Sequence, residues 1–376
     1  MDKNAPDTDP YQQLINGTLW DAYCDALKLT GRHLLRTESP GDPFNQAEGL
    51  RYLTRMVRAG LESLVESSEA EFPRFADPAT SRIKIGADNP DNRYMTARIR
   101  GHHIYKLIGN RGTVANINFA TKGGGFQKSN KKMAGTGFLS GQDLKVDEDG
   151  SFEIMISKEQ PASGNWLPMD DSSNMLLIRQ TFNDRDQEQP ADLTISCLTH
   201  TAPPAPLSPE AFAARLMAAA NYTENTVKLF ADWSGLFKEK HYNCLPLGDQ
   251  SMYLAAGGDP NITYYHGYWE LADDEVMVIE LTPPECEFWN FQVDNYWMES
   301  LDYQHHKIHV NCHGAHYNAD GSVALVIAHK DPGHPNWLTT AGHQLGTSLF
   351  RLIGAEQIPP EIPVRIEKFD NFVAAQ

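Results

Sequence analysis

Residues 320–351 read DGSVALVIAHKDPGHPNWLTTAGHQLGTSLFR, which is a turn, an apolar run, a polar segment and a second apolar run. Much of this pattern occurs once before, where Asp149-Gly-Ser leads through an apolar run to Asn165-Trp-Leu and on to Arg179. The Asp-Gly-Ser turns and the Asn-Trp-Leu triplets recur at an offset of 171 residues (149 to 320, 165 to 336), and the arginines recur at 172 (179 to 351). Matches at one offset indicate a tandem duplication.

Each copy consists of short apolar or alternating runs that are separated by turn residues. Pro90 and Tyr94 precede the first copy as Pro260 and Tyr264 precede the second, which extends the repeat upstream. This pattern predicts a mainly β protein with some α structure (α+β), built from two tandem antiparallel β-sandwich or jelly-roll-like modules. The expected segments are an N-terminal helical part at 1–80, a first sandwich at 85–200, a Pro-rich linker with helices at 201–255, and a second sandwich at 256–376. Within the linker segment we expect one helix that Ser208 caps and a second helical piece from Thr223 to about Phe237.

Composition limits the class of protein and its partners. A chain of 376 residues suggests two domains, and 41% hydrophobic with 22% charged residues is ordinary globular composition. A net charge of −17 argues against nucleic acid and anionic membranes as partners. The five scattered cysteines form no CxxC pair, and neither a signal peptide nor a membrane span is visible. We therefore expect a soluble cytoplasmic protein that acts on a small molecule and could form a homo-oligomer.

Both copies also resemble a known family. The similar segments of the second copy are Phe288-Trp-Asn-Phe-Gln292, Trp297-Met-Glu-Ser-Leu-Asp-Tyr303, Ala328-His-Lys-Asp-Pro-Gly-His-Pro-Asn-Trp-Leu338 and Thr340-Ala-Gly-His343, with Gly346 and Arg351. Those of the first copy are Pro90-Asp-Asn-Arg-Tyr94, Gly109-Asn-Arg-Gly112, Gly164-Asn-Trp-Leu-Pro168 and Arg179-Gln-Thr-Phe-Asn-Asp184. Over about residues 90–370 the chain resembles the bacterial family catalogued as domain of unknown function 1214. The resemblance implies β-sandwich folds and no particular reaction. The chain departs from the family pattern at Arg185, where tryptophan is expected, and in the histidine-rich run 305–316.

That run contains five histidines, His305, His306, His309, His313 and His316. On a strand, residues 305, 309 and 313 would share a face at intervals of roughly 13 Å, too far apart for neighbours to bind one ion. Three interpretations stay open: a metal site, a pocket wall with one or two working histidines, and a partly solvated strand face. We assign no metal ligand and no cofactor.

A second candidate cluster is His329, Asp331 and His343, which surround the Asn336-Trp-Leu triplet. An aspartate beside an imidazole fixes its tautomer and raises its basicity, as a general base requires. The alternative is structural, with Asp331 capping a turn and His343 bonded to backbone. The corresponding positions of the first copy hold no such trio: Lys158, Gln160 and Ser172. Because only the second copy has these groups, the pattern favours a function there.

Aromatic residues are concentrated in the second copy, where they fit either a sandwich core or the wall of a pocket for a ring compound. Arg179 and Arg351 end equivalent strands, and their recurrence favours structural ion pairs over anion binding. The glycine-rich segment 123–141 lacks the P-loop spacing and is predicted to be a mobile hairpin loop or lid.

The resulting hypothesis is a cofactor-independent enzyme that performs a lyase-type acid–base step on a hydroxylated aromatic or hydrophobic ring compound, with hydrolysis as the next choice. The predicted catalytic residues are His343 as base, Asp331 as its orienter, and Tyr265 or His329 as acid. The predicted substrate-binding residues are Trp337, Trp289, Trp297, Tyr303, His305, His309 and His103. The alternatives are a carbohydrate- or small-ligand-binding protein without activity and a metal-dependent enzyme that uses the histidine run.

Overall fold

The computed structural model describes residues 9–128 and 132–375. The helical elements are α1 (Pro10–Asn16), α2 (Thr18–Gly31), α3 (Pro43–Leu61), the π-helical turn η1 (Glu62–Glu66), α4 (Pro209–Lys240), α5 (Gln250–Ala255) and α6 (Phe369–Ala374). Helix α4 begins at a Ser-Pro pair, in which Ser208 accepts a hydrogen bond from the Ala211 amide and Pro209 occupies the first turn. Within the described residues no helix has both the length and the apolar character needed to cross a bilayer.

The first module is a sandwich of two four-stranded sheets, in the orders β1-β7-β3-β4 and β6-β5-β2-β8. Its strands are β1 (Asn92–Arg98), β2 (Tyr105–Asn110), β3 (Asn116–Gly124), β4 (Met133–Ser140), β5 (Ser151–Ser157), β6 (Asn165–Pro168), β7 (Ser173–Thr181) and β8 (Asp192–Cys197). Alternate apolar side chains of both sheets form one core between them, as the strand periodicity requires.

The second module repeats this topology strand for strand, in the orders β10-β16-β12-β13 and β15-β14-β11-β18. Its strands are β10 (Ile262–Glu270), β11 (Glu275–Leu281), β12 (Phe288–Val293), β13 (His309–Asn311), β14 (Val323–Ala328), β15 (Trp337–Thr339), β16 (Leu345–Ile353) and β18 (Val364–Lys368), with a small pair of β9 (Leu245–Pro246) and β17 (Glu361–Ile362). Both copies even contain the same parallel pair, β5 with β6 and β14 with β15. The predicted fold class is confirmed.

The duplication extends to individual hydrogen bonds. Asn165 accepts from the Lys145 amide and donates to the carbonyls of Lys145 and Glu153. Asn336 makes the same three bonds 171 residues later, with the amide and carbonyl of His316 and the carbonyl of Ala324. The Asn-Trp-Leu triplet is therefore a structural device that attaches a loop to the edge of each sandwich.

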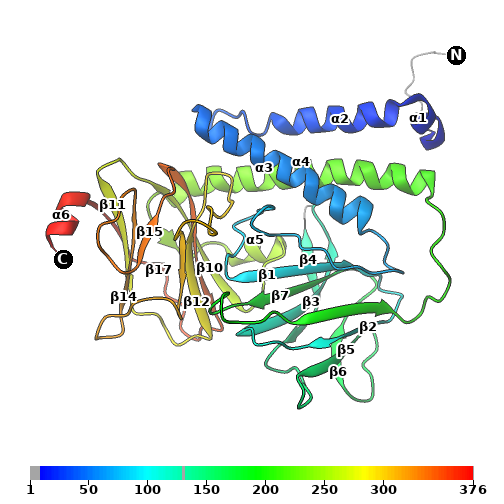
Figure 1. Ribbon diagram of the computed structural model, residues 1–376. Helices are drawn as coiled ribbons and strands as arrows, with labels where there is room; N and C mark the ends of the chain where they lie inside the picture. The colour runs from blue at the N-terminus through cyan, green and yellow to red at the C-terminus, as the bar shows by residue number, and fades with distance from the viewer. Residues whose placement is uncertain (1–8, 129–131, 376) are drawn as a thin grey trace.

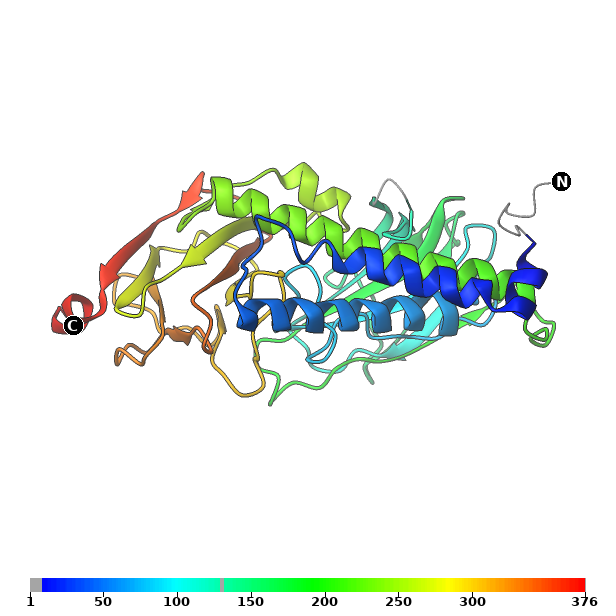
Figure 2. The same cartoon turned by 90° about the horizontal axis from the view of Figure 1, so that it is seen from above.

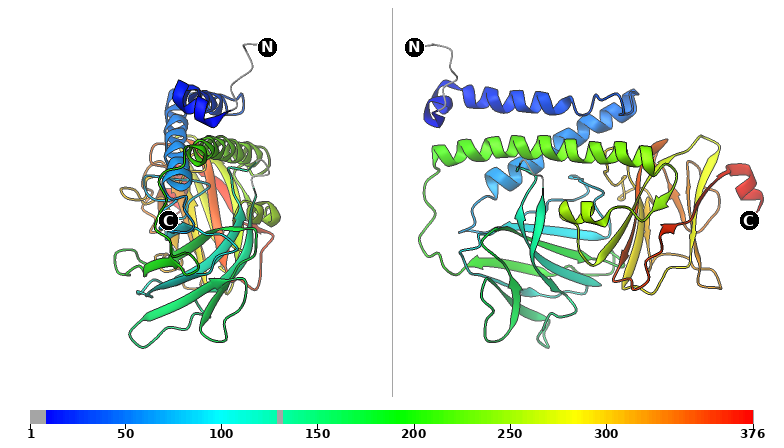
Figure 3. Two further views of the ribbon diagram at one scale, coloured as in Figure 1. Left: turned by 90° about the vertical axis from the view of Figure 1, so that its right-hand side faces the viewer. Right: turned by 180° about the vertical axis from the view of Figure 1, so that it is seen from behind.

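Helices cover one side of both sandwiches. Helix α4 runs along the molecule and passes over the two modules, with α2 and α3 packed against it (Figure 1; Figure 2). Figure 3 shows the same layer from the side and from behind. A separate apolar cluster joins α3 and α4 to strand β10, so the helices connect the modules.

The structure corrects three expectations about local elements. Residues 209–240 form one helix instead of two pieces. Most of the glycine-rich segment is strand, in β3 and β4, and residues 129–131 of the expected loop lie outside the described part. Glycine is needed there for close packing, because a Cβ on Gly137 would stand 1.9 Å from the Pro168 carbonyl oxygen. Only His309 of the five-histidine run lies in a strand.

Candidate functional site

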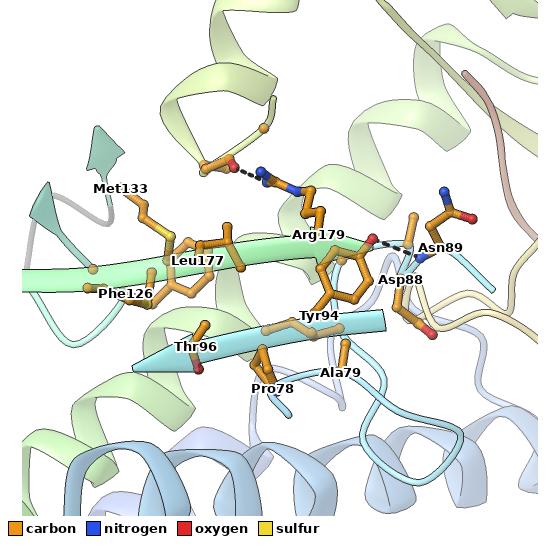
Figure 4. A pocket seen from close by; sticks show the side chains of 18 of the residues that line it. Pro78, Ala79, Asp88, Asn89, Tyr94, Thr96, Phe126, Met133, Leu177 and Arg179 are labelled. Atoms are coloured by element: carbon orange, nitrogen blue, oxygen red, sulfur yellow. Dashed lines mark hydrogen bonds between the residues drawn. The ribbon is translucent and has the colours of Figure 1, made fainter. Parts of the chain in front are cut away.

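A cavity of about 240 Å³ lies where the two modules meet α4. Its walls come from β1 and β7 of the first module, β10 and β16 of the second, helix α4, and the segments around residues 76–79, 85–89, 124–127 and 256–258. Figure 4 shows the first-module side, where Tyr94, Thr96, Leu177 and Arg179 project from neighbouring strands toward the cavity. The cavity is therefore a property of the assembled chain and not of either sandwich alone.

The two modules contribute equivalent strands to the cavity, and each reaches into the other. Arg179 on β7 donates through Nη2 to the carbonyl of Gly257, which precedes β10, over 2.8 Å. Arg351 on β16 donates through Nη2 to the carbonyl of Ala87, which precedes β1. Residues 87 and 257 are related by the repeat. Each module is therefore bound to the other through an equivalent hydrogen bond from arginine to a backbone carbonyl.

His266 on β10 is the titratable imidazole in this cavity. It is 3% exposed and lies among aromatic rings, with centroids 4.8 Å from Phe237 and 4.7 Å from Tyr253. In the described part of the chain, no group hydrogen-bonds to either ring nitrogen, and Nδ1 is fully buried. Burial, and then the charge of Arg351, hold the pKa of His266 well below its usual value, so the ring is neutral at physiological pH.

Tyr253 lines the same cavity, but its buried hydroxyl lies beside the backbone of Gly248, which does not line the cavity, and has no partner in the described chain. Burial raises the pKa of this phenol, which therefore stays protonated. The cavity thus contains an imidazole that can accept or donate a proton and that the protein leaves unused.

The predicted catalytic residues do not line this cavity. His329 is held at both ring nitrogens, by the Thr340 hydroxyl at 2.9 Å and the Leu271 carbonyl at 3.2 Å. Asp331 accepts from the amide of Gly333 in its own turn. Tyr265 lies in the core of the second sandwich and donates to the Pro359 carbonyl.

His343 is closer to the prediction. It is buried, its Nδ1 lies 3.2 Å from the Thr340 carbonyl oxygen, and its Nε2 has no partner in the described chain. Its ring packs edge-on against Phe44, and burial lowers its pKa. His329 and His343 both contact Thr340. They do not share a hollow with Asp331 and Tyr265. The catalytic role of the four stays a prediction.

The predicted substrate-binding residues divide into three groups. Trp289, Trp297 and Trp337 pack in the interior or against it, and each indole N–H is used, by Tyr317, Asn45 and Ala328 respectively. His103 bonds to Thr199, and the exposed His305 bonds to Asp302. Tyr303 and His309 do share a hollow, a separate and more open one of about 760 Å³, where His309 Nε2 lies 3.3 Å from Asp91 Oδ1.

His266 was missed although a sequence signal for it existed. On strand β10, Tyr264, His266 and Tyr268 alternate with Tyr265 and Trp269. The second set enters the sandwich core, and the first faces the helices and the cavity. Period-two alternation alone therefore separates His266, on the cavity side of the strand, from Tyr265, in the sandwich core.

No cluster of three or more histidine, cysteine, aspartate or glutamate side chains that could hold a metal ion occurs within residues 9–128 and 132–375.

Fold and cavity together define a tandem β-sandwich protein whose modules enclose a buried site under a shared helix. The family described as "Protein of unknown function (DUF1214)" matches residues 117–183 and 274–357, one stretch in each module. The crystal structure of an uncharacterised protein from Burkholderia cenocepacia is 48% identical, with a TM-score of 0.93 over 96% of this chain and 99% of that chain. The chain belongs to the DUF1214 family.

A second solved structure, the VPA0106 protein from Vibrio parahaemolyticus, is 13% identical, with a TM-score of 0.48 over 85% of this chain and 98% of that one. No curated protein matches the chain significantly.

Proposed function

We propose that this protein binds a small ring compound in the cavity between its modules and exchanges a proton with it through His266. The reaction class we favour is a lyase-type acid–base step on a hydroxylated aromatic or hydrophobic ring. The observation that carries the proposal is the buried, neutral imidazole of His266, which faces a cavity and bonds to no described group.

The size and lining of the cavity support a ligand of this kind. A cavity of about 150 Å³ accommodates benzene, so 240 Å³ leaves room for a substituted ring. Phe126, Phe230 and Trp233 supply aromatic wall. The polar lining residues include His266, Asn89 and Arg351. A mostly apolar cavity with a few convergent polar groups is typical of small-molecule sites.

The chemistry follows from the state of the imidazole. A neutral imidazole offers one acceptor nitrogen and one N–H donor. His266 would take a proton from the bound ring compound or its substituent. Burial of the ring strengthens this interaction.

The test is a comparison of turnover and binding for a panel of hydroxylated aromatic and alicyclic compounds. Binding is followed by the shift in melting temperature and turnover by mass spectrometry of the products. His266→Gln is expected to lower turnover by roughly 10²–10⁴-fold while ring compounds still bind. His306→Gln, at an exposed position outside both hollows, is the matched control and should behave as wild type.

Two other results would redirect the assignment. Loss of turnover in His343→Gln but not in His266→Gln would return the base to the residue predicted from the sequence. Binding of ring compounds by the wild type without any product would favour a binding protein over an enzyme.

A further inference from the structure

The geometry points to an organic anion as the ligand: a ring compound that carries a carboxylate, held by the guanidinium of Arg351 and the side-chain amide of Asn89. The inference rests on the proposed function, because it concerns the same cavity, and it names the substrate class.

The two copies differ in the surroundings of their equivalent arginines. Arg179 and Arg351 occupy equivalent strand ends and make equivalent bonds to the opposite module. Arg179 also forms an ion pair, with Nη1 3.4 Å from Asp259 Oδ2. The residue equivalent to Asp259, 170 positions earlier, is Asn89. At this equivalent position, the copy that contains Arg179 is matched with a carboxylate, Asp259, and the copy that contains Arg351 is matched with an amide, Asn89.

Arg351 is left without a counter-ion. It is 4% exposed, and no carboxylate of the described residues forms an ion pair with it. Its Nη1 instead donates to the neutral amide oxygens of Gln292 at 2.6 Å and Asn290 at 3.4 Å. A buried charge without an opposite partner is unfavourable, so a ligand that brings an anion to Arg351 would offset this cost.

The acidic residues near Arg351 do not act as its counter-ion. Asp88 accepts bonds from the amide and hydroxyl of Ser300. Asp91 accepts from two asparagine amides and lies beside His309. Burial raises the pKa of Asp294 to about 8, against the opposing effect of Arg351, so this carboxyl is mainly protonated at neutral pH.

Asn89 provides an independent observation. It is 3% exposed and lines the cavity, where Figure 4 shows its side chain beside Asp88. Its Oδ1 accepts from the Asp91 amide and from Asn290 Nδ2, but its own Nδ2 is buried and has no partner in the described chain. An unpaired buried donor is unfavourable. Such a donor is satisfied by an acceptor that the ligand brings.

The charge of the whole cavity agrees with this assignment. Three arginines line it, Arg98, Arg179 and Arg351, against one carboxylate, Asp88, although the chain carries a net charge of −17. Arginine favours carboxylates because its donors match their two oxygens. A bound anion would also offset the charge of Arg351 that lowers the pKa of His266, and would thereby bring the imidazole closer to the range of a general base.

The test uses matched pairs of ligands that differ only in charge: benzoate with benzamide, and cyclohexanecarboxylate with cyclohexanecarboxamide. Affinities are measured by calorimetry at fixed ionic strength and pH 7. We expect the wild type to bind each carboxylate at least about tenfold more tightly than its amide. Equal affinities would overturn the assignment.

The decisive variant is Asn89→Asp, which gives the second copy the acid that the first copy has. It is nearly isosteric and should abolish the preference for carboxylates while affinity for the amides persists. The matched control is the reverse exchange, Asp259→Asn, which leaves Arg351 untouched and should retain the preference. A preference that survives in Asn89→Asp would refute the role of Arg351.

Failure of the inference and failure of the proposed function are distinguishable. Amides and carboxylates that bind equally would remove the anion site but leave the cavity as a ligand site. A carboxylate preference sensitive to Asn89→Asp, with turnover unaffected by His266→Gln, would keep the anion site and remove the proposed chemistry. No binding of any ring compound to the wild type would remove both.

Discussion

The fold buries the carboxyl group of Asp294 in surroundings where its ionisation is unfavourable. It lies just after β12 and is fully buried. Its Oδ1 accepts from Gln292, and its Oδ2 has no partner in the described chain. Burial is the main reason that its pKa rises to about 8. The group is neutral in the folded protein at a pH where an unfolded chain would ionise it.

This difference makes stability depend on pH with a definite sign. An unfolded aspartate has a pKa of about 3.9, so the contribution of Asp294 is fully present below about pH 4 and is lost as pH rises through about 8. Asp294→Asn cannot ionise. Between pH 5 and pH 9 we expect the free energy of unfolding of the wild type to fall, relative to the variant, by roughly 2–5 kcal/mol.

Urea denaturation of both proteins at pH 5, 7 and 9 measures that difference. Glu299, whose pKa burial raises to about 7, contributes the same trend to wild type and variant and cancels in the comparison. Parallel pH profiles for the two proteins would show that Asp294 ionises normally in the fold.

At the level of elements, much of the topology could be predicted because the signals are local. The Asp-Gly-Ser turn ahead of β14 and the asparagine ahead of β15 act within a few residues of their own strands, and the offset of 171 residues made the second copy a check on the first. Helix α4 was predicted as two pieces because polar residues interrupt its apolar pattern. One of them, Thr223, bonds its hydroxyl to the Ala219 carbonyl inside the helix and so does not break it.

The candidate site was harder to predict, for a physical reason. Residues such as His266, Asn89 and Arg351 become neighbours of one cavity only when two modules and a helix are assembled. No periodicity within one strand encodes that arrangement. The clustered tryptophans mostly pack in the interior, and His309 and Tyr303 are the predicted residues that line the second hollow described above.

The repeated asparagines allow a paired test of an element. Asn165→Ala and Asn336→Ala each remove three hydrogen bonds to backbone groups that hold a loop to its sandwich. We expect each to lower the free energy of unfolding by about 2–4 kcal/mol, because the backbone groups lose their partners. Asn371→Ala, at an exposed position in α6, should change stability by less than about 0.5 kcal/mol.

Chemical denaturation of the three variants and the wild type gives these values directly. Since the two asparagines make the same bonds in equivalent places, their effects should agree within about 1 kcal/mol. A large effect in one copy and none in the other would mean that the copies differ in how much their loops contribute to stability.

Several buried contacts cross the boundary between the N-terminal half and the second sandwich and hold the whole molecule together. Arg55 on α3 forms a buried ion pair with Glu299 of the second module. Lys84, ahead of the first sandwich, donates to the carbonyls of Ser300 and Leu301. Together with the reciprocal bonds of Arg179 and Arg351, these interactions tie the N-terminal half to the second sandwich.

Because of these contacts we expect the protein to unfold in one cooperative step, although it is a duplication. In differential scanning calorimetry, the calorimetric and van't Hoff enthalpies should agree within about 10–20%. Residues 1–204 and 205–376 made separately should not fold, since α4 in the second part packs on α2 and α3 in the first. Co-expressed, the two parts should assemble.

Two resolved transitions, or a second half that folds alone, would show that the modules are independent. The cavity gives the same experiment a further readout. A ligand that contacts both modules binds only the assembled state, and at 100 times its dissociation constant it should stabilise that state by about 2.7 kcal/mol. In a cooperative molecule this gain must raise the melting temperature of the single transition. With independent modules, at least one transition would keep its melting temperature.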